Sequence, residues 1–320
     1  MAQLGVRIRS VFPDSGPDAS RSPASADGTW AWDQYWCDGR LASCGGTGGA
    51  NYQPTITQAW RRFFGRLADG SRILDVCTGN GAIARLAAEV AVARGIRFAI
   101  DAFDSAAITP DAVPTAIGRS MISFRERIAA ESTPYPADRF DCLVGQYAIE
   151  YTELDRSLPE MVRVSKSNCR VRFMIHARAG DVVAAARRQL GDIERLRRTG
   201  DIFPAARRLV ELRARVAPEH DLRAAETHYR QGMQALQHAA SDAVEPAMYH
   251  DTCSVLTHAL SQQSRVGGEP VLEKIAEVAG SLEAHAARLA AMSRAAFDGA
   301  QAQRMAARAE TLWKQPFQCK

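Results

Sequence analysis

Paired cysteine motifs are missing from this sequence of 320 residues. Its seven cysteines include no CxxC pair, and none is grouped with histidines at the spacing of a zinc site. Their number is odd, and several lie in apolar, strand-like runs. We therefore expect reduced thiols that pack as small apolar side chains, no bound metal, and a cytoplasmic location.

Long apolar runs and an excess of one charge are missing too. No stretch of about 18 uncharged apolar residues occurs, and the N-terminus has no apolar segment of the secretory type, so we expect no membrane partner. The 40 basic and 36 acidic residues leave a net charge of +4. That excess is too small to require a nucleic-acid partner. The 46% of hydrophobic and 24% of charged residues are typical of globular proteins.

The N-terminal part of the sequence is poor in apolar residues before an aromatic cluster begins. Residues 11–28 are rich in Ser, Pro, Asp, Ala and Gly, so we expect residues 1–28 to form a flexible tail. Trp30, Trp32, Tyr35 and Trp36 follow, and then a glycine-rich run at 45–49. That run is not a phosphate loop, because no GK[ST] follows it.

From residue 54 onward, helical and strand-like apolar patterns alternate. Helices are predicted at 54–68, 82–94 and 157–164, and strands at 72–77, 97–101, 121–125, 141–146 and 170–176. Alternation of this kind predicts an α/β fold for residues 29–180: a Rossmann-like, doubly wound, mostly parallel sheet covered by helices on both faces. No strand is evident after His176.

The pattern changes after residue 180. Residues 181–320 carry Ala, Arg and Leu at helical spacing, with Gly and Pro between segments, and predict an all-helical region of four to six helices. Its paired arginines at 187–188, 197–198 and 207–208 are typical of the solvated face of long helices rather than of an RNA site.

The strongest functional pattern lies between the first predicted strand and the helix that follows it. Asp75 lies near the end of the strand, and the stretch Val76-Cys77-Thr78-Gly79-Asn80-Gly81 leads into the helix. Glycines let the backbone approach a ligand, and a helix N-terminus offers free N–H donors, so this layout is typical of nucleoside-binding sites. It is not G-x-G-x-x-G, since position 77 is Cys and position 84 is Ala. The pattern therefore disfavours a nicotinamide-dependent oxidoreductase.

This turn resembles the first motif of the class I S-adenosylmethionine-dependent methyltransferase family, with Cys77 in place of its first glycine. Further segments similar to the family's follow in the same order, at 104–106 (DSA), 130–141 (AESTPYPADRFD), 146–151 (QYAIEY) and 160–164 (EMVRV). The resemblance covers about residues 54–180. It implies S-adenosyl-L-methionine as the cofactor and methyl transfer as the activity.

The resemblance also implies which residues bind the cofactor. They are Asp75, Cys77, Thr78, Gly79, Asn80, Gly81, Asp104, Ala130, Glu131 and Gln146. Asp75 would serve the amino group, and Asp104 the ribose hydroxyls, with Asp101 as the alternative. Ala129 stands where the family usually has Asp, so adenine recognition is expected to rest on backbone groups.

A general base is needed if the methyl acceptor is a hydroxyl or a protonated amine. His176, at the end of the fifth strand, is the first candidate, because its unperturbed pKa is about 6.5. Tyr147 is the second, ahead of Glu150 and Tyr151. The alternative for His176 is a histidine that only forms local hydrogen bonds.

The resemblance favours a small-molecule methyl acceptor. No Asp/Asn-Pro-Pro-Tyr/Phe motif follows the fourth strand, which disfavours methylation of nucleic-acid bases. A macromolecular acceptor, or a non-catalytic binding subunit, is the alternative. Segments 30–52 and 181–318 are expected to form a lid over an apolar acceptor pocket. For the helices, a homodimer interface or a packing buttress is the competing interpretation.

Overall fold

The computed structural model describes residues 29–44, 51–112 and 122–317, and these divide into two compact units. The sheet unit contains the described residues up to Ala184 and those from Ala291 onward. The helical unit contains Ala185–Ala290. The tail expected at 1–28 and the glycine-rich run at 45–49 lie outside the described residues.

Five parallel strands form the sheet, in the order β3-β2-β1-β4-β5. They are β1 (Arg72–Val76), β2 (Ala99–Phe103), β3 (Ile122–Arg125), β4 (Phe140–Gln146) and β5 (Ser165–Met174). The strand order reverses between β1 and β4, which is the doubly wound arrangement, and ligands bind at the carboxyl ends of strands at such a point. The predicted Rossmann-like fold class is confirmed. The described residues add no antiparallel strand to this sheet.

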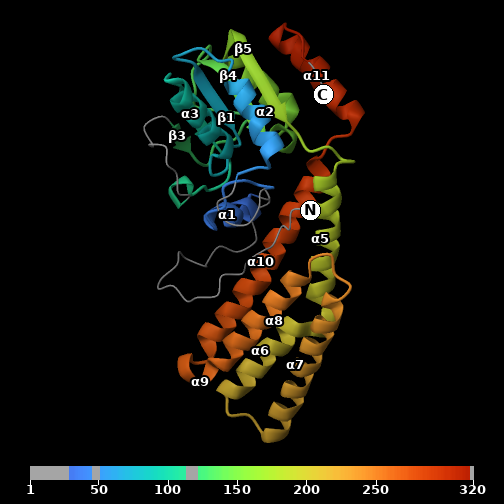
Figure 1. The fold of residues 1–320 in the computed structure, drawn as a ribbon. Coiled ribbons are helices and arrows are strands. Elements are labelled where there is room, and N and C mark those ends of the chain that lie inside the picture. Colours follow the sequence, from blue (N-terminus) through green and yellow to red (C-terminus); the bar gives the residue numbers. More distant parts are fainter. Residues whose placement is uncertain (1–28, 45–50, 113–121, 318–320) are drawn as a thin grey trace. The chain divides into compact units, whose positions relative to one another are not determined.

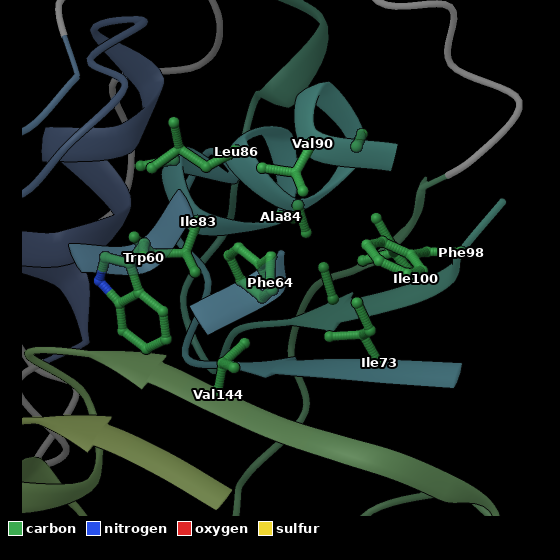
Figure 2. Close-up of a cluster of buried hydrophobic side chains, with 14 of the residues drawn as sticks. Trp60, Phe64, Ile73, Ile83, Ala84, Leu86, Val90, Phe98, Ile100 and Val144 are labelled. Carbon is green, nitrogen blue, oxygen red and sulfur yellow. The ribbon is translucent and has the colours of Figure 1, made fainter. Parts of the chain in front are cut away.

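Helices cover both faces of the sheet (Figure 1). One face packs against α2 (Pro54–Phe64) and α3 (Ala82–Arg94), and the other against α4 (Leu154–Val164) and α11 (Gly299–Trp313). Side chains alternate between the two, because successive strand residues point to opposite faces. Ile73 lies in the first core and Leu74 in the second. Figure 2 shows the first core, where Trp60 and Phe64 of α2 lie over Ile73 and Val144.

Several strand boundaries differ from the prediction, and the largest shifts are in β2 and β5. β2 begins and ends two residues later than expected, so Asp101 lies inside the strand. Its carboxylate accepts a hydrogen bond from Arg139 at 2.9 Å, which allows a charged residue there. β5 begins at Ser165 rather than at 170, directly after α4. The polar stretch 165–169, which resembled a turn, is therefore extended.

The chain returns to the sheet after the helical unit. Ala177 pairs with Phe297 in an isolated parallel bridge, and α11 then runs along the second face. Trp313 Nε1 donates to Ser165 Oγ at 2.9 Å, which ties α11 to the beginning of β5. Residues 291–317 therefore belong to the sheet unit, although their helical spacing alone grouped them with 181–290.

The remaining helices have the following bounds: α1 (Trp30–Cys37), α5 (Asp181–Arg198), α6 (Ile202–Ala214), α7 (Glu219–Ala240), α8 (Pro246–Ser261), α9 (Gln263–Val266) and α10 (Gly268–Ala295). Inside the helical unit, α7 packs closely on the turn before α6, where a Cβ on Gly200 would lie 2.6 Å from Gly232 Cα. No described helix is long and apolar enough to cross a membrane.

Candidate functional site

A cavity of about 470 Å³ lies at the carboxyl ends of β1, β2 and β4. Every residue that lines it belongs to the sheet unit. Trp32 and Trp36 of α1 form one wall, and Ala291 and Arg294 near the end of α10 form part of another. Its volume falls in the range of small-molecule sites, roughly 300–1,000 Å³. Segment 30–52 thus contributes to the cavity wall through α1, and segment 181–318 through the end of α10, while their role as a lid stays a prediction.

Asp75 lies near the end of β1, and its carboxylate binds the turn that follows the strand. Its Oδ2 accepts hydrogen bonds from Thr78 Oγ1 at 2.6 Å and from the backbone N–H of Ala84 at 3.0 Å. Burial nevertheless raises the pKa of Asp75 to about 7. The side chain also lines the cavity. An internal carboxylate therefore already occupies the N-terminal turn of α3, where a phosphate would otherwise bind.

Aromatic rings cover the glycines of this turn. Gly79 has a φ of +54°, and a Cβ built on it would lie 2.4 Å from the Trp36 ring. The Phe124 ring lies at 2.5 Å from the equivalent position on Gly81. The space that these glycines leave is thus filled by protein side chains. Cys77 and Thr78, in contrast, line the cavity.

Asp104 and Asp101 lie in different surroundings. Asp104 lines the cavity, and its two carboxylate oxygens accept from the backbone N–H groups of Gly79 at 2.8 Å and Ala106 at 2.9 Å. Burial raises the pKa of Asp104 to about 6. Asp101 does not line the cavity and is held by Arg139. Of the two candidates for ribose binding, the structure brings Asp104 to the site.

The Asn80 side chain is fully buried and does not line the cavity. Its Nδ2 donates to the carbonyls of Trp36 at 2.9 Å and Arg40 at 2.7 Å, and its Oδ1 accepts from Thr109 N–H at 2.8 Å. These bonds join the turn after β1 to α1 and to the segment after β2. Asn80 therefore holds the aromatic wall in place and has no polar atom left over for a ligand.

The Asn80→Ala variant is expected to lose about 3 kcal/mol of unfolding free energy, at about 1 kcal/mol for each of its three hydrogen bonds. Denaturant unfolding measures this loss. Asn51→Ala is the matched control, because Asn51 is only half-buried and makes two such bonds, to Ala82 and Tyr52. Equal losses in the two variants would contradict the linking role of Asn80.

Of the remaining residues predicted to bind the cofactor, one lines the cavity and two do not. Gln146 lines the cavity, and its Oε1 accepts from Trp60 Nε1 at 2.6 Å. Ala130 is buried in the second core, and Glu131 accepts from the backbone N–H of Glu153 at 2.8 Å. Neither Ala130 nor Glu131 is among the residues that line the cavity.

His176 lies behind the cavity wall rather than in it. Its ring stacks on Tyr147 with the centroids 3.9 Å apart, and only Tyr147 lines the cavity. Glu150, which also lines it, accepts at Oε1 from His176 N at 2.8 Å and forms a 2.9 Å hydrogen bond with His176 Nδ1. His176 thus fixes Glu150 and Tyr147 from behind. No described group bonds Glu150 Oε2, which is buried.

Burial and hydrogen bonding act on His176 in opposite directions. Burial alone would lower its pKa, but the hydrogen bonds with Cys44 and Glu150 outweigh burial and raise the pKa to about 9. Burial also raises the pKa of Tyr147 to about 12, so Tyr147 keeps its proton at neutral pH. Its backbone has a φ of +56°, which is rare for a bulky side chain and common at functional sites.

Sequence reasoning did not single out Cys44 or Ser43. Ser43 lines the cavity, and Cys44 Sγ lies 3.5 Å from His176 Nε2. The two partners are 132 residues apart in the chain, so no local pattern could indicate the contact. The aromatic cluster at 30–36 was the only available signal that this segment approaches the sheet.

No family model and no curated protein matches the chain. The solved structures that match include the YcgJ protein from Bacillus subtilis, at 20% identity over 45% of this chain and 59% of that chain, with a TM-score of 0.32. An S-adenosylmethionine-dependent methyltransferase from Mesorhizobium loti matches at 18% identity over 39% and 53%, with a TM-score of 0.31. Phosphoethanolamine N-methyltransferase 2 from Haemonchus contortus, solved with S-adenosyl-L-methionine, matches at 16% identity over 47% and 33%, with a TM-score of 0.33.

The matched part spans 59% or less of the length of each of these three proteins. At such identities the likeness concerns the fold alone.

Proposed function

We propose that the chain is an S-adenosylmethionine-dependent methyltransferase that acts on a small-molecule acceptor. The observation that carries this proposal is the charge of the cavity. Asp75, Asp104 and Glu150 line it, and Arg294 is the one basic residue among the described lining residues. A dinucleotide would bring phosphates to an acidic wall and to a helix N-terminus that Asp75 already occupies. A ligand with sulfonium and ammonium charges fits these residues.

Named residues suit each part of this cofactor. Asp75, Thr78 and Gln146 would hold the amino-acid part, and Asp104 would accept hydrogen bonds from the ribose hydroxyls. When bound, the cofactor supplies an electrophilic methyl group on a sulfonium. The chain contributes mainly position and exclusion of water, and positioning alone accounts for several kcal/mol in such reactions.

Among the polar residues that line the cavity, which also include Ser43, Tyr52 and Ser105, we assign contact with the acceptor to Tyr147 and Glu150. Tyr147 keeps its proton because burial raises its pKa to about 12, so it donates a hydrogen bond that orients the acceptor. Glu150 Oε2 makes no hydrogen bond to the described residues, and we assign to it the role of general base for the acceptor. His176 then acts as a positioning residue, through its two hydrogen bonds to Glu150 Oε1.

Cofactor binding is expected to release protons. Burial raises the pKa of Asp75 to about 7 and of Asp104 to about 6, so both are partly protonated near neutrality. A cation beside them favours their charged forms, so affinity should rise as pH increases from about 5.5 to 7.5, by up to tenfold per pH unit for each proton released. Calorimetry with S-adenosylmethionine in two buffers of different ionisation enthalpy measures the released protons directly.

S-adenosylhomocysteine is the matched ligand for this titration, because it keeps the ammonium group and lacks the sulfonium charge. We expect it to release fewer protons. The proposed cofactor is wrong if S-adenosylmethionine binds too weakly to detect and a nicotinamide dinucleotide binds tightly.

The acceptor class is tested with cofactor that carries a labelled methyl group. The protein is incubated with a metabolite extract, and in parallel with protein and RNA fractions of the same cells. We expect label in the metabolite fraction, since the cavity wall of Trp32, Trp36 and Tyr151 encloses a volume suited to a small molecule. Label that enters only protein or RNA would establish a macromolecular acceptor instead.

A further inference from the structure

Three side chains beside the cavity form a continuous line of hydrogen bonds. Cys44 Sγ lies 3.5 Å from His176 Nε2, and His176 Nδ1 lies 2.9 Å from Glu150 Oε1. A nucleophile, a base within hydrogen-bonding reach and a third group that orients the base make up the arrangement that activates nucleophiles in enzymes. The methyl-transfer site proposed above does not use Cys44, which is not among the described residues that line the cavity.

The imidazole in the centre of this line is firmly held. The side chains of His176 and Glu150 are 1% and 0% exposed. Tyr147 stacks on one face of the ring, and Tyr151 contacts it edge-on with the centroids 6.0 Å apart. Because Nδ1 faces the carboxylate, Nδ1 carries a proton and Nε2 is directed at sulfur. Since the pKa of His176 is raised to about 9, Nε2 also carries a proton at neutral pH, and it donates toward Cys44 Sγ.

Cys44 differs from the other cysteines in its surroundings. Cys142 and Cys169 are fully buried in the sheet, whereas Cys44 is half-buried. Cys77 is half-buried too, but burial raises the pKa of its thiol. Ser43 Oγ also donates to Cys44 Sγ, at 3.8 Å. Two hydrogen-bonding groups therefore converge on this sulfur.

We propose that Cys44, His176 and Glu150 form a nucleophilic thiol site that reacts with soft electrophiles, namely small disulfides and alkylating carbon compounds. Cys44 Sγ attacks the electrophilic sulfur or carbon, and one new bond to Sγ forms. The bond to the leaving group breaks, and the leaving group departs with the electron pair. The thiol proton of Cys44 passes to solvent, and the leaving group departs either as a thiolate that takes a proton from solvent or as a halide ion, so atoms and charge balance. Methyl transfer is not required for this reaction.

The test compares Cys44 with Cys37 in the full-length chain, by iodoacetamide labelling at pH 6.5 and peptide mass spectrometry. Cys37 is exposed, but burial of its thiol and the nearby Asp33 and Asp38 raise its pKa. It therefore serves as an internal control that is more accessible and less activated. We expect Cys44 to be alkylated at least tenfold faster than Cys37. A Cys44 rate equal to or below that of Cys37 overturns the proposal without any variant.

The variants His176→Gln and Glu150→Gln test the line of hydrogen bonds. We expect His176→Gln to slow alkylation of Cys44 at least tenfold, Glu150→Gln to slow it less, and neither to change Cys37. Labelling of Cys142 and Cys169 reports the fold, since both stay protected while the sheet is intact. With cystamine as the probe, Cys44 of the unaltered chain should form the mixed disulfide first. A Cys44 rate that is unchanged in folded His176→Gln, or preferential reaction of Cys37 with cystamine, overturns the proposal.

Discussion

The Asp104→Asn variant is expected to bind S-adenosylmethionine about 10- to 100-fold more weakly than the unaltered chain, because a charge-assisted hydrogen bond contributes about 1.5–3 kcal/mol. Asp104 lines the cavity, and both of its oxygens already accept backbone N–H groups from the two turns that it joins. An amide cannot accept at both positions, so the substitution removes the charge beside the ligand and also loosens Gly79. Calorimetry at pH 8, where the Asp104 carboxyl is ionised, measures the full effect.

Asp101→Asn is the matched control. Asp101 lies inside β2, three residues before Asp104, and is also buried, but it binds Arg139 and does not line the cavity. Its substitution should lower the unfolding free energy, because Arg139 loses its partner, and should leave the cofactor affinity unchanged. If Asp101→Asn weakens cofactor binding as much as Asp104→Asn does, then either Asp101 binds the ribose or both variants weaken binding by destabilising the fold.

The helices and strands that nearby residues mark, by an apolar run or a glycine turn, could be predicted from the sequence. The helix at 82–94 has its predicted bounds, and β1 ends one residue before the predicted position, since an apolar run and a glycine turn mark both. Asp104 could be placed at the site because the short stretch Asp104-Ser105-Ala106 resembles a segment of the methyltransferase family. In each case the information lies within a few residues of the element it describes.

Contacts between distant segments could not be predicted. β5 begins with polar residues, and these are tolerated because Trp313 and Gln315, from the other end of the chain, bind Ser165 Oγ and the Cys169 carbonyl. The same holds for His176, whose position at a strand end indicated a catalytic base. His176 lies behind the cavity wall because the side chains of Tyr147 and Glu150 lie between it and the cavity. The directions of these side chains cannot be read from the sequence.

The glycines of the turn at 75–81 show how a correct motif can serve two purposes. Gly79 was predicted to leave room for the cofactor, and the structure places the Trp36 ring in that room. The α1 wall can therefore approach the turn only because position 79 has no side chain. This gives Gly79 a role in building the cavity wall, in addition to the role that the motif implies.

Gly79→Arg is accordingly expected to abolish detectable cofactor binding in calorimetry. The arginine side chain displaces Trp36, and it enters a conformation with φ of +54° that costs roughly 1–2 kcal/mol for a residue with a Cβ. Gly79→Ala tests the cause with less disruption. It should lose about 2–5 kcal/mol of unfolding free energy, the sum of that strain and of about 1–3 kcal/mol for overpacking against the ring.

Two controls separate the strain from the clash. Gly95 has a φ of +67°, and a Cβ there meets nothing within 4 Å, so Gly95→Ala should lose only the roughly 1–2 kcal/mol of strain. In a Trp36→Ala background, Gly79→Ala should likewise lose only that amount, since the ring is gone. The difference between the two backgrounds is the coupling energy of Gly79 and Trp36, expected to be at least about 1 kcal/mol. If the two substitutions prove additive to within about 0.5 kcal/mol, the ring does not rest on Gly79 in solution, and the wall is built in another way.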